Sequence, residues 1–304
     1  MSFSRLISGI KRMNNPTVAG LDPKLDFIPE HIKNKSFSLY GETLAGAADA
    51  LLQFNIGLID ALYDIVPAVK PQSAYYEMYG YEGEKALTKT IRYAASKGMF
   101  VILDGKRNDI GPTASAYAAA YLGETAVGNS SVSAFGADAL TVNGYLGTDG
   151  LTPFTDICKT NDKGIFVLVK TSNKSSGELQ DKKLEDETVY EFMGQMCETL
   201  GADTIDEYGY SAVGAVVGAT YPEQLTELRK KLPHTFFLVP GYGAQGGGAA
   251  GLRGAFDKNG LGAVVNSSRA IMCAYKTENA PGEAFAEAAR REAIRMREDI
   301  NANI

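Results

Sequence analysis

The chain has 304 residues, of which 45% are hydrophobic and 22% charged, a composition typical of globular proteins. Its net charge of −6 argues against a nucleic-acid-binding protein, which usually carries a basic face, but leaves an anionic small-molecule substrate open. Only two histidines, His31 and His234, are present, so a zinc site or a histidine-dependent triad is not expected. Three cysteines without a C-x-x-C pair favour reduced thiols and a cytoplasmic protein.

The first segment of the chain has apolar residues at helical spacing: Phe3, Leu6, Ile7 and Ile10. This spacing predicts a short amphipathic helix packed on the body of the protein. A signal peptide would need a longer unbroken apolar stretch. No segment approaches the roughly 18 apolar residues that a membrane span needs, so no membrane partner is expected.

Short apolar, β-branched runs then alternate with amphipathic stretches along the chain. Runs that are apolar throughout are typical of strands buried on both faces in a parallel sheet. The predicted strands are 17–21, 65–70, 100–106, 139–143, 165–172, 214–219, 236–240 and 263–266. The predicted helices are 42–63, 83–97, 112–134, 185–208, 222–231 and 281–300.

This alternation of strand and helix predicts an α/β fold, a (β/α)8 TIM barrel, with a doubly wound open sheet as the competing architecture. No linker or repeat divides the sequence, so residues 1–304 are expected to form a single barrel domain. The polar loop at 173–186 follows the fifth strand. Loops of this length in compact domains are often functional, and we expect it to act as a lid.

Charged and polar residues gather where the predicted strands end, the place where barrel enzymes carry their catalytic groups. Asp104 and Lys106 lie two residues apart and are therefore expected on the same face of the third strand. Lys70, at the end of the second strand, adds a second cation. Such charges are rarely buried without a partner. An ion pair that only fixes the strand register is the simpler alternative, but polar ends on seven strands make it less favoured.

The ends of the seventh and eighth strands predict a phosphate site. A glycine-rich turn at 241–247 exposes backbone N–H groups, Gln245 can close over the phosphate oxygens, and Arg269 supplies a forked donor. Residues 241–246 also match G-x-G-x-x-G. They do not open a βαβ unit, however, so a nicotinamide or flavin cofactor is not expected.

With these residues in place, the sequence resembles the orotidine 5'-monophosphate decarboxylase family. The family signature D-x-K-x-x-D stands as Asp104, Lys106 and Asp109, followed by Ile110-Gly-Pro-Thr113. The motif Pro-Gly-x-Gly-Ala-Gln-Gly-Gly begins at Pro240. Further family positions fall, in the family's order, on Asp22, Lys70, Ser172, Gln245 and Arg269.

The resemblance implies removal of CO2 from orotidine 5'-monophosphate to give UMP, without a metal or another cofactor. It assigns catalysis to Lys106, Asp104, Asp109 and Lys70. It assigns substrate binding to Asp22 for the ribose, Ser172 for the pyrimidine, Gln245 and Arg269 for the phosphate, and Thr113. It also implies a homodimer in which Asp109 and Thr113 reach into the partner's site.

Two other functions remain open at this point. The first is a sugar-phosphate lyase of the same barrel superfamily, whose members share Asp-x-Lys on the third strand but use Mg²⁺ held by added carboxylates. Lys70 stands where such a lyase would carry an acidic residue. The second is a barrel that binds a nucleotide phosphate without catalysis, which the intact set of Asp104, Lys106 and Asp109 argues against.

Overall fold

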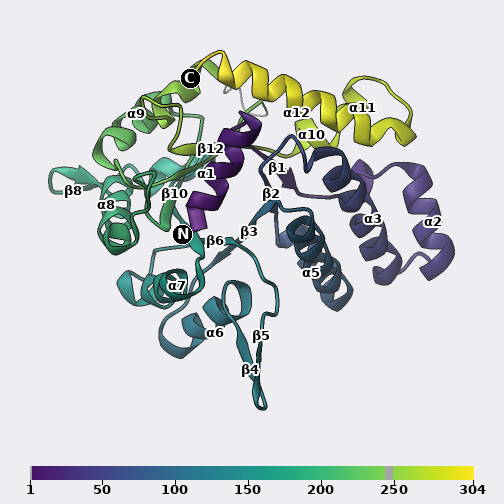
Figure 1. The fold of residues 1–304 in the computed structure, drawn as a ribbon, viewed down its shortest axis with the longest axis horizontal. Coiled ribbons are helices and arrows are strands. Elements are labelled where there is room, and N and C mark those ends of the chain that lie inside the picture. The colour runs from purple at the N-terminus through teal and green to yellow at the C-terminus, as the bar shows by residue number, and fades with distance from the viewer. Residues whose placement is uncertain (1, 244–248) are drawn as a thin grey trace.

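The computed structural model describes residues 2–243 and 249–304, and their central feature is a closed barrel of eight parallel strands (Figure 1). Around the barrel the order is β1-β12-β11-β10-β7-β6-β3-β2, so the strands follow one another in chain order. The predicted TIM barrel is confirmed, and each of the eight predicted strands is present. Their bounds are Thr17–Leu21 (β1), Ala68–Pro71 (β2), Phe100–Arg107 (β3), Ala139–Val142 (β6), Gly164–Lys170 (β7), Val213–Val217 (β10), Phe237–Pro240 (β11) and Ala263–Ser267 (β12).

Side chains alternate along each strand between the lumen of the barrel and the surrounding helices. The lower lumen is filled by an apolar cluster that includes Phe100, Phe166 and Val264. The predicted N-terminal helix is confirmed as α1, Ser2–Met13. Its buried Phe3 and Leu6 belong to the same cluster, so α1 closes this end of the barrel (Figure 1).

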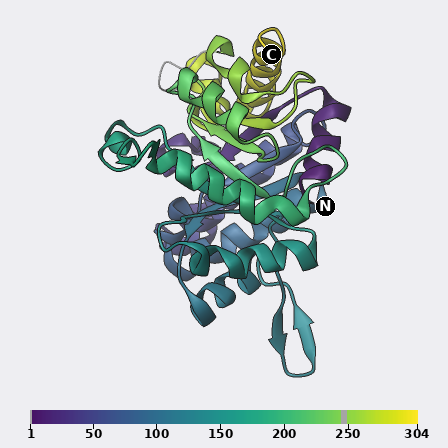
Figure 2. The same ribbon diagram turned by 90° about the vertical axis from the view of Figure 1, so that its left-hand side faces the viewer.

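Helices cover the outside of the barrel and pack on the outward-facing residues of the strands (Figures 1 and 2). Most of the predicted helices are present with shifted ends. The helices between the strands are α2 Glu30–Tyr40, α3 Leu44–Leu62, the short α4 Ala74–Glu77, α5 Gly80–Ser96, α6 Gly111–Tyr121, α7 Thr148–Asn161, α8 Val189–Gly201 and α9 Pro222–Lys231. A 3-10 helix, η4 Ala249–Ala255, stands before β12, and α10 Arg269–Met272, α11 Ala274–Thr277 and α12 Phe285–Asn301 follow it. Among the described residues, no helix is long and apolar enough to cross a membrane.

Two helices of ten or more residues were not predicted. Helix α7 buries Leu151, Phe154 and Cys158 at helical spacing, but Gly150 and Pro153 interrupt it with poor helix formers. Helix α2, Glu30–Tyr40, buries only Ile32 and Ser36. Packing therefore decides the structure of α7 against weak local propensity, whereas α2 buries too few residues to leave a clear amphipathic pattern.

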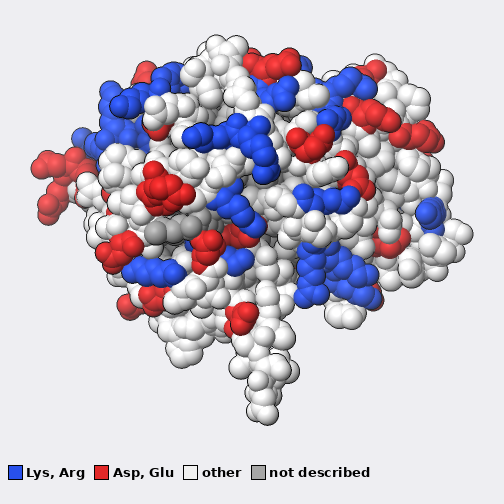
Figure 3. Space-filling model, in the orientation of Figure 1, with Lys and Arg blue, Asp and Glu red and all other residues white. Residues whose placement is uncertain are grey.

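The predicted helix 112–134 is wrong in its second half. Helix α6 ends at Tyr121, and the chain then forms an exposed antiparallel hairpin from β4, Thr125–Val127, and β5, Ser130–Val132. A two-residue turn joins the strands, and Gly128 adopts the positive φ of +61° that such turns require. The hairpin projects from the body, and no charged residue lies between 125 and 137 (Figures 2 and 3).

The loop at 173–186 has more structure than predicted. It contains a 3-10 turn, η2 Lys174–Glu178, and a short strand β8, Lys183–Leu184, which pairs with β9, Glu187–Thr188. Thr188 caps α8: its hydroxyl accepts the backbone N–H of Glu191, and its own N–H donates to the Glu191 carboxylate. The segment is thus tied at its far end to the helix that follows.

Candidate active site

The ends of β2 and β3 place three charged side chains in contact in the upper lumen. The Asp104 carboxylate accepts hydrogen bonds from Lys70 Nζ at its Oδ2 atom and from Lys106 Nζ at its Oδ1 atom, both at 2.6 Å. Lys70 is buried, whereas the Lys106 side chain is 44% exposed. The predicted pairing of Asp104 with both lysines is confirmed. Of the two ammonium groups, that of Lys106 is the one on the open side of the barrel.

A bulge in β3 makes this contact possible. The pairing of β3 with β6 shifts between Leu103 and Arg107, so three residues of β3 lie opposite Thr141. Lys106 within this bulge has a φ of +48°, an uncommon value for a residue other than glycine. Simple strand alternation, the basis of the prediction, is therefore only part of the reason why Lys106 meets Asp104.

Thr141 was missed by the sequence analysis. Its hydroxyl donates to Asp104 Oδ1 at 2.9 Å and accepts the backbone N–H of Lys106 at 2.9 Å. It thereby fixes the carboxylate and the bulged backbone together. Its place at the lumen-facing position nearest the end of β6 was the only available signal.

The electrostatics of the cluster favour the ionised forms of Asp104 and Lys70. Burial alone would raise the pKa of Asp104, but the charges and hydrogen bonds of Lys70 and Lys106 outweigh burial and hold this pKa far below its usual value. Burial would likewise lower the pKa of Lys70, yet Asp104 and Asp22 raise it above its usual value. At neutral pH the site therefore presents a fixed array of alternating charges.

Two buried oxygen atoms beside this array accept no hydrogen bond from the described residues: Oδ1 of Asp22 and Oδ1 of Asn266. Asp22 Oδ1 lies 4.0 Å from Lys70 Nζ. A buried acceptor without a donor costs free energy, so both atoms are suited to a ligand that brings hydroxyl or N–H groups.

Ser172 lies at the same end of the barrel, against the ends of β10 and β11. A Cβ atom placed on Gly218 would stand 2.9 Å from the Ser172 Cβ, and one placed on Gly241 would stand 3.8 Å from it. Glycine at 218 is therefore needed for Ser172 to occupy this position. The structure brings this predicted residue to the rim of the lumen.

Arg269, the first residue of α10, lines a cavity of about 570 Å³ together with Gly243, Phe27 and Lys276. The Arg269 side chain forms no ion pair with the described residues and is exposed. A guanidinium in an open cavity beside a glycine turn is suited to a phosphate. Gln245, the second predicted phosphate contact, lies outside the described residues.

Asp109 and Thr113 are not part of the charged cluster. Asp109 follows β3, and among the described residues its carboxylate accepts only the backbone N–H of Ile110, at 2.8 Å. Thr113 is exposed in the first turn of α6. Within one chain, these two predicted residues remain apart from the charged cluster.

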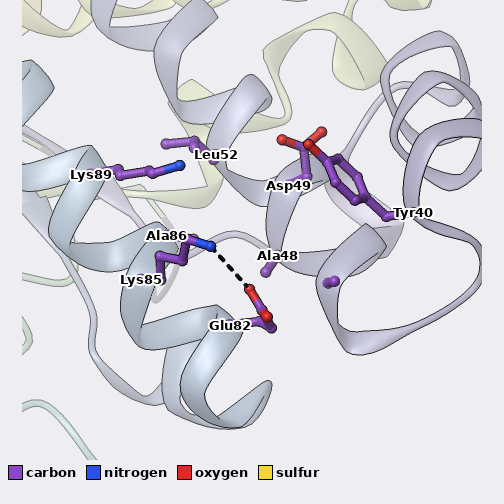
Figure 4. Close-up of a pocket in the computed structure, with 9 residues that line it drawn as sticks. Tyr40, Ala48, Asp49, Leu52, Glu82, Lys85, Ala86 and Lys89 are labelled. Carbon is purple, nitrogen blue, oxygen red and sulfur yellow. Dashed lines mark ion pairs between the residues drawn. The ribbon is translucent and has the colours of Figure 1, made fainter.

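A second pocket lies outside the barrel, between α3 and α5 (Figure 4). Its volume is about 80 Å³, and an ion pair between Glu82 and Lys85 spans 3.8 Å within it. Sites for drug-sized ligands usually have volumes of about 300–1,000 Å³. This pocket is therefore too small for a nucleotide.

Comparison with known proteins agrees with this geometry. The model of the Orotidine 5'-phosphate decarboxylase / HUMPS family matches residues 44–283. Orotidine 5'-phosphate decarboxylase of Rhodopirellula baltica is 46% identical, with 99% of each chain covered, and that of Caldicellulosiruptor bescii is 41% identical, over 100% of this chain and 99% of the relative.

Solved structures show the same relationship. The structure of Leishmania donovani OMP decarboxylase matches with a TM-score of 0.72 and 31% identity, covering 98% of each chain. The structure of Leishmania donovani UMP synthase matches with a TM-score of 0.73 and 33% identity, and the match covers 97% of this chain but 56% of that one. Family model, relatives and barrel agree, and the chain belongs to the orotidine 5'-phosphate decarboxylase / HUMPS family.

Proposed function

We propose that this protein removes CO2 from orotidine 5'-monophosphate to give UMP, the last step of de novo UMP synthesis, without a metal or another cofactor. The observation that carries the proposal is the contact of Asp104 with two ammonium groups at 2.6 Å in the upper lumen of a barrel of this family. Three free, buried cysteines favour a cytoplasmic enzyme, where thiols stay reduced.

Lys106 acts on the bond that breaks. Loss of CO2 leaves an electron pair on C6 of the pyrimidine, with little delocalisation to stabilise it. A fixed ammonium near C6 stabilises this charge as it develops and then delivers the proton that completes UMP. The partly exposed Lys106, held by Asp104 from one side, is the ammonium suited to this role.

Asp104 keeps Lys106 in place and acts on the substrate. Its low pKa keeps it ionised at physiological pH, so it repels the substrate carboxylate if the two lie close together. This repulsion ends when neutral CO2 leaves, which lowers the barrier from the bound state. Lys70 balances the charge of Asp104, and the free oxygen of Asp22 accepts a ribose hydroxyl.

The far end of the nucleotide supplies binding energy. Arg269 and Gln245 hold the phosphate, Ser172 contacts the pyrimidine amide, and the loop at 173–186 closes over the site as a lid. Binding at the phosphate lowers the barrier at C6 because it offsets the cost of loop closure and of removing water.

The active enzyme is a homodimer with shared sites. Asp109 and Thr113 stand apart from the charged cluster of their own chain, on the loop after β3 and in the exposed first turn of α6. The exposed apolar residues Ile110 and Leu146 lie near Asp109 and suit a surface that a second copy covers. We therefore place Asp109 and Thr113 in the partner's site.

A magnesium-dependent lyase is the other candidate. The carboxylates available to a metal are Asp22 and Asp104, and Lys70 Nζ lies 4.0 Å from the first and 2.6 Å from the second. The ammonium thus occupies the position where a bridging cation would be needed. This arrangement favours the decarboxylase without a metal.

The direct test follows the ultraviolet absorbance of orotidine 5'-monophosphate after addition of protein treated with EDTA. We expect complete conversion to UMP at an unchanged rate when Mg²⁺ is restored. Loss of activity in EDTA would support the lyase class, and tight UMP binding without CO2 release would support a binding module. Orotidine without phosphate should lose several orders of magnitude in kcat/KM.

Shared sites are tested by mixing Lys106→Ala protein with Asp109→Ala protein, each inactive alone. A heterodimer carries one site free of both substitutions, so activity should return as subunits exchange, up to about one quarter of the wild-type value in an equal mixture. Subunit exchange is followed separately with two affinity tags. Exchange without any return of activity would reject the shared site.

A further inference from the structure

Lys170, the last residue of β7, is a buried charge that the proposed mechanism does not use. Its side chain is 1% exposed, less than any other charged group in an ion pair of the described residues. Its ammonium donates to Asp181 Oδ1 at 2.6 Å and to Ser176 Oγ at 3.4 Å. A buried ammonium is costly unless it is paired, so these contacts offset the cost of burying Lys170.

A bulge turns Lys170 away from the lumen. Phe166 and Leu168 face the apolar lumen cluster, and regular alternation would send Lys170 the same way. The pairing with β10 shifts at this point, so that Lys170 lies opposite Val217, a residue of the outer cluster. The Lys170 ammonium instead lies 4.8 Å from the ring centre of Tyr221.

The ammonium is thus enclosed by groups from separate parts of the fold. The Tyr190 ring of α8 lies 5.6 Å away, and Tyr221 belongs to the turn before α9. Aromatic faces attract a cation, most strongly where water is excluded. Asp181 completes this enclosure from the segment that follows β7.

Two hydrogen bonds next to the ion pair join the same ends of the loop. The backbone N–H of Thr171 donates to Gln180 Oε1 at 2.9 Å, and the Gln180 amide donates to Thr171 Oγ1 at 2.7 Å. Residues 170–171 are therefore fastened to residues 180–181, and residues 172–179 form a closed loop between them. Most of this loop is exposed, so these ties hold it more than burial does.

Ser172 is the first residue of this loop. On one side it packs against Gly218, which has no room for a Cβ atom. The backbone that leads into Ser172 is held by Lys170 and Thr171, which bond to Asp181 and Gln180 at the far end of the loop. Both constraints matter, because most of the loop that begins at Ser172 is exposed and offers little packing to hold its backbone.

We propose that Lys170 is a positioning residue: its ion pair with Asp181 fixes the ends of the 172–179 loop and so aims Ser172 at the pyrimidine. This inference rests on the proposed function, in which Ser172 contacts the substrate. Misplacement of a substrate contact by about 1 Å can cost 100-fold in rate. We therefore expect Lys170→Met, which keeps the apolar stem and removes the charge, to lower kcat/KM roughly 10- to 100-fold.

The decisive measurement is a double-mutant cycle on kcat/KM for orotidine 5'-monophosphate with Lys170→Met and Ser172→Ala. If Lys170 acts through Ser172, its substitution has little further effect once the serine side chain is gone. Full additivity of the two effects, or wild-type kinetics of Lys170→Met, would overturn the proposal. Lys159→Met is the matched control, because Lys159 is a surface lysine paired with the exposed Asp203. It should leave kcat/KM unchanged.

A second variant and a second readout keep the test decisive if Lys170→Met folds poorly. Asp181 is 43% exposed, so Asp181→Ser removes no buried apolar contact, although it leaves Lys170 unpaired, and it should lower kcat/KM in the same direction. Hydrogen exchange of the amides in 171–181 should quicken in both variants, without substrate. Unchanged exchange would overturn the inference while the decarboxylase proposal stands, whereas a wild-type protein inert toward the substrate overturns both.

Discussion

The two halves of the barrel lumen are built from opposite kinds of side chain. In the lower half, Phe3 of α1 packs against Phe166 and Phe236, with ring centres 4.8 and 5.4 Å away. In the upper half, Asp104 accepts hydrogen bonds from two ammonium groups. The same strands supply both halves, because lumen-facing positions simply change from apolar to charged toward the strand ends.

The difference teaches how the fold tolerates a charged site. The lower half buries apolar surface, which is the main source of folding free energy. The upper half holds charges whose desolvation opposes folding unless each is paired. A variant of the lower half should therefore mainly change stability. A variant of the exposed Lys106 in the upper half should mainly change chemistry, whereas loss of a partner from the buried pair should change stability as well.

The largest effect is expected for Lys106→Ala. Removing the group that stabilises and protonates the carbanion should lower kcat by at least about 10⁴-fold. The side chain is 44% exposed, so the free energy of unfolding should change little. Single-turnover CO2 release and urea unfolding measure the two quantities.

The control for that experiment is Lys35→Ala, at an exposed position of α2. It should leave both quantities at their wild-type values. Turnover by Lys106→Ala within tenfold of wild type would contradict the catalytic role of the upper half.

The next effect is expected for Phe3→Ala in the lower half. Phe3 is 1% exposed, and truncation of a buried phenylalanine costs about 3–5 kcal/mol through lost burial and the cavity left behind. The folded fraction should retain its kcat, because α1 lies at the opposite end of the barrel from the charged cluster. Chemical unfolding and active-site titration check the two statements.

Phe192→Ala is the matched control, because Phe192 is 45% exposed on α8. We expect it to change the free energy of unfolding by less than about 0.5 kcal/mol. A loss of kcat per active site in Phe3→Ala would mean that the two halves of the lumen are coupled.

The sequence predicted the lower half well because burial leaves a periodic signature. All eight strands and the amphipathic α1 followed from apolar runs and helical spacing. The prediction of a helix beyond Tyr121 failed because the alanine-rich α6 leads into further apolar residues, and the turn signal at Gly128 was overlooked. Local patterns there agree with either a helix or a hairpin.

The upper half was predicted only in part, because its geometry depends on irregular backbone. The bulges at Lys106 and Lys170 decide where both ammonium groups point, and neither leaves a pattern in the sequence. Thr141 escaped notice for a similar reason: a threonine inside an apolar strand is ordinary until the bonds to Asp104 and Lys106 are known.

The smallest of the three effects is the loss of stability expected for Asp104→Asn. Asparagine leaves Lys70 buried without its closest carboxylate, which should destabilise the protein by about 3 kcal/mol at pH 7. The direction in which this stability changes with pH follows from the lowered pKa of Asp104. The contribution of the Asp104 carboxylate to stability is fully present above its pKa in the unfolded chain, about 3.9. This contribution is lost as the pH falls toward the pKa of Asp104 in the folded protein.

The free energy of unfolding should therefore differ between wild type and Asp104→Asn by a constant amount from pH 7 to pH 5, and by less below about pH 4. Urea unfolding of both proteins across this range measures the difference. In wild type, the raised pKa of Lys70 keeps its ammonium charged in the folded protein up to about pH 10, whereas Asp104→Asn removes the main cause of that rise. A difference that grows as the pH falls would mean that Asp104 is protonated more easily in the folded protein than in the unfolded chain. The alternating charges would then strain the upper lumen, and the lower half alone would hold the barrel closed.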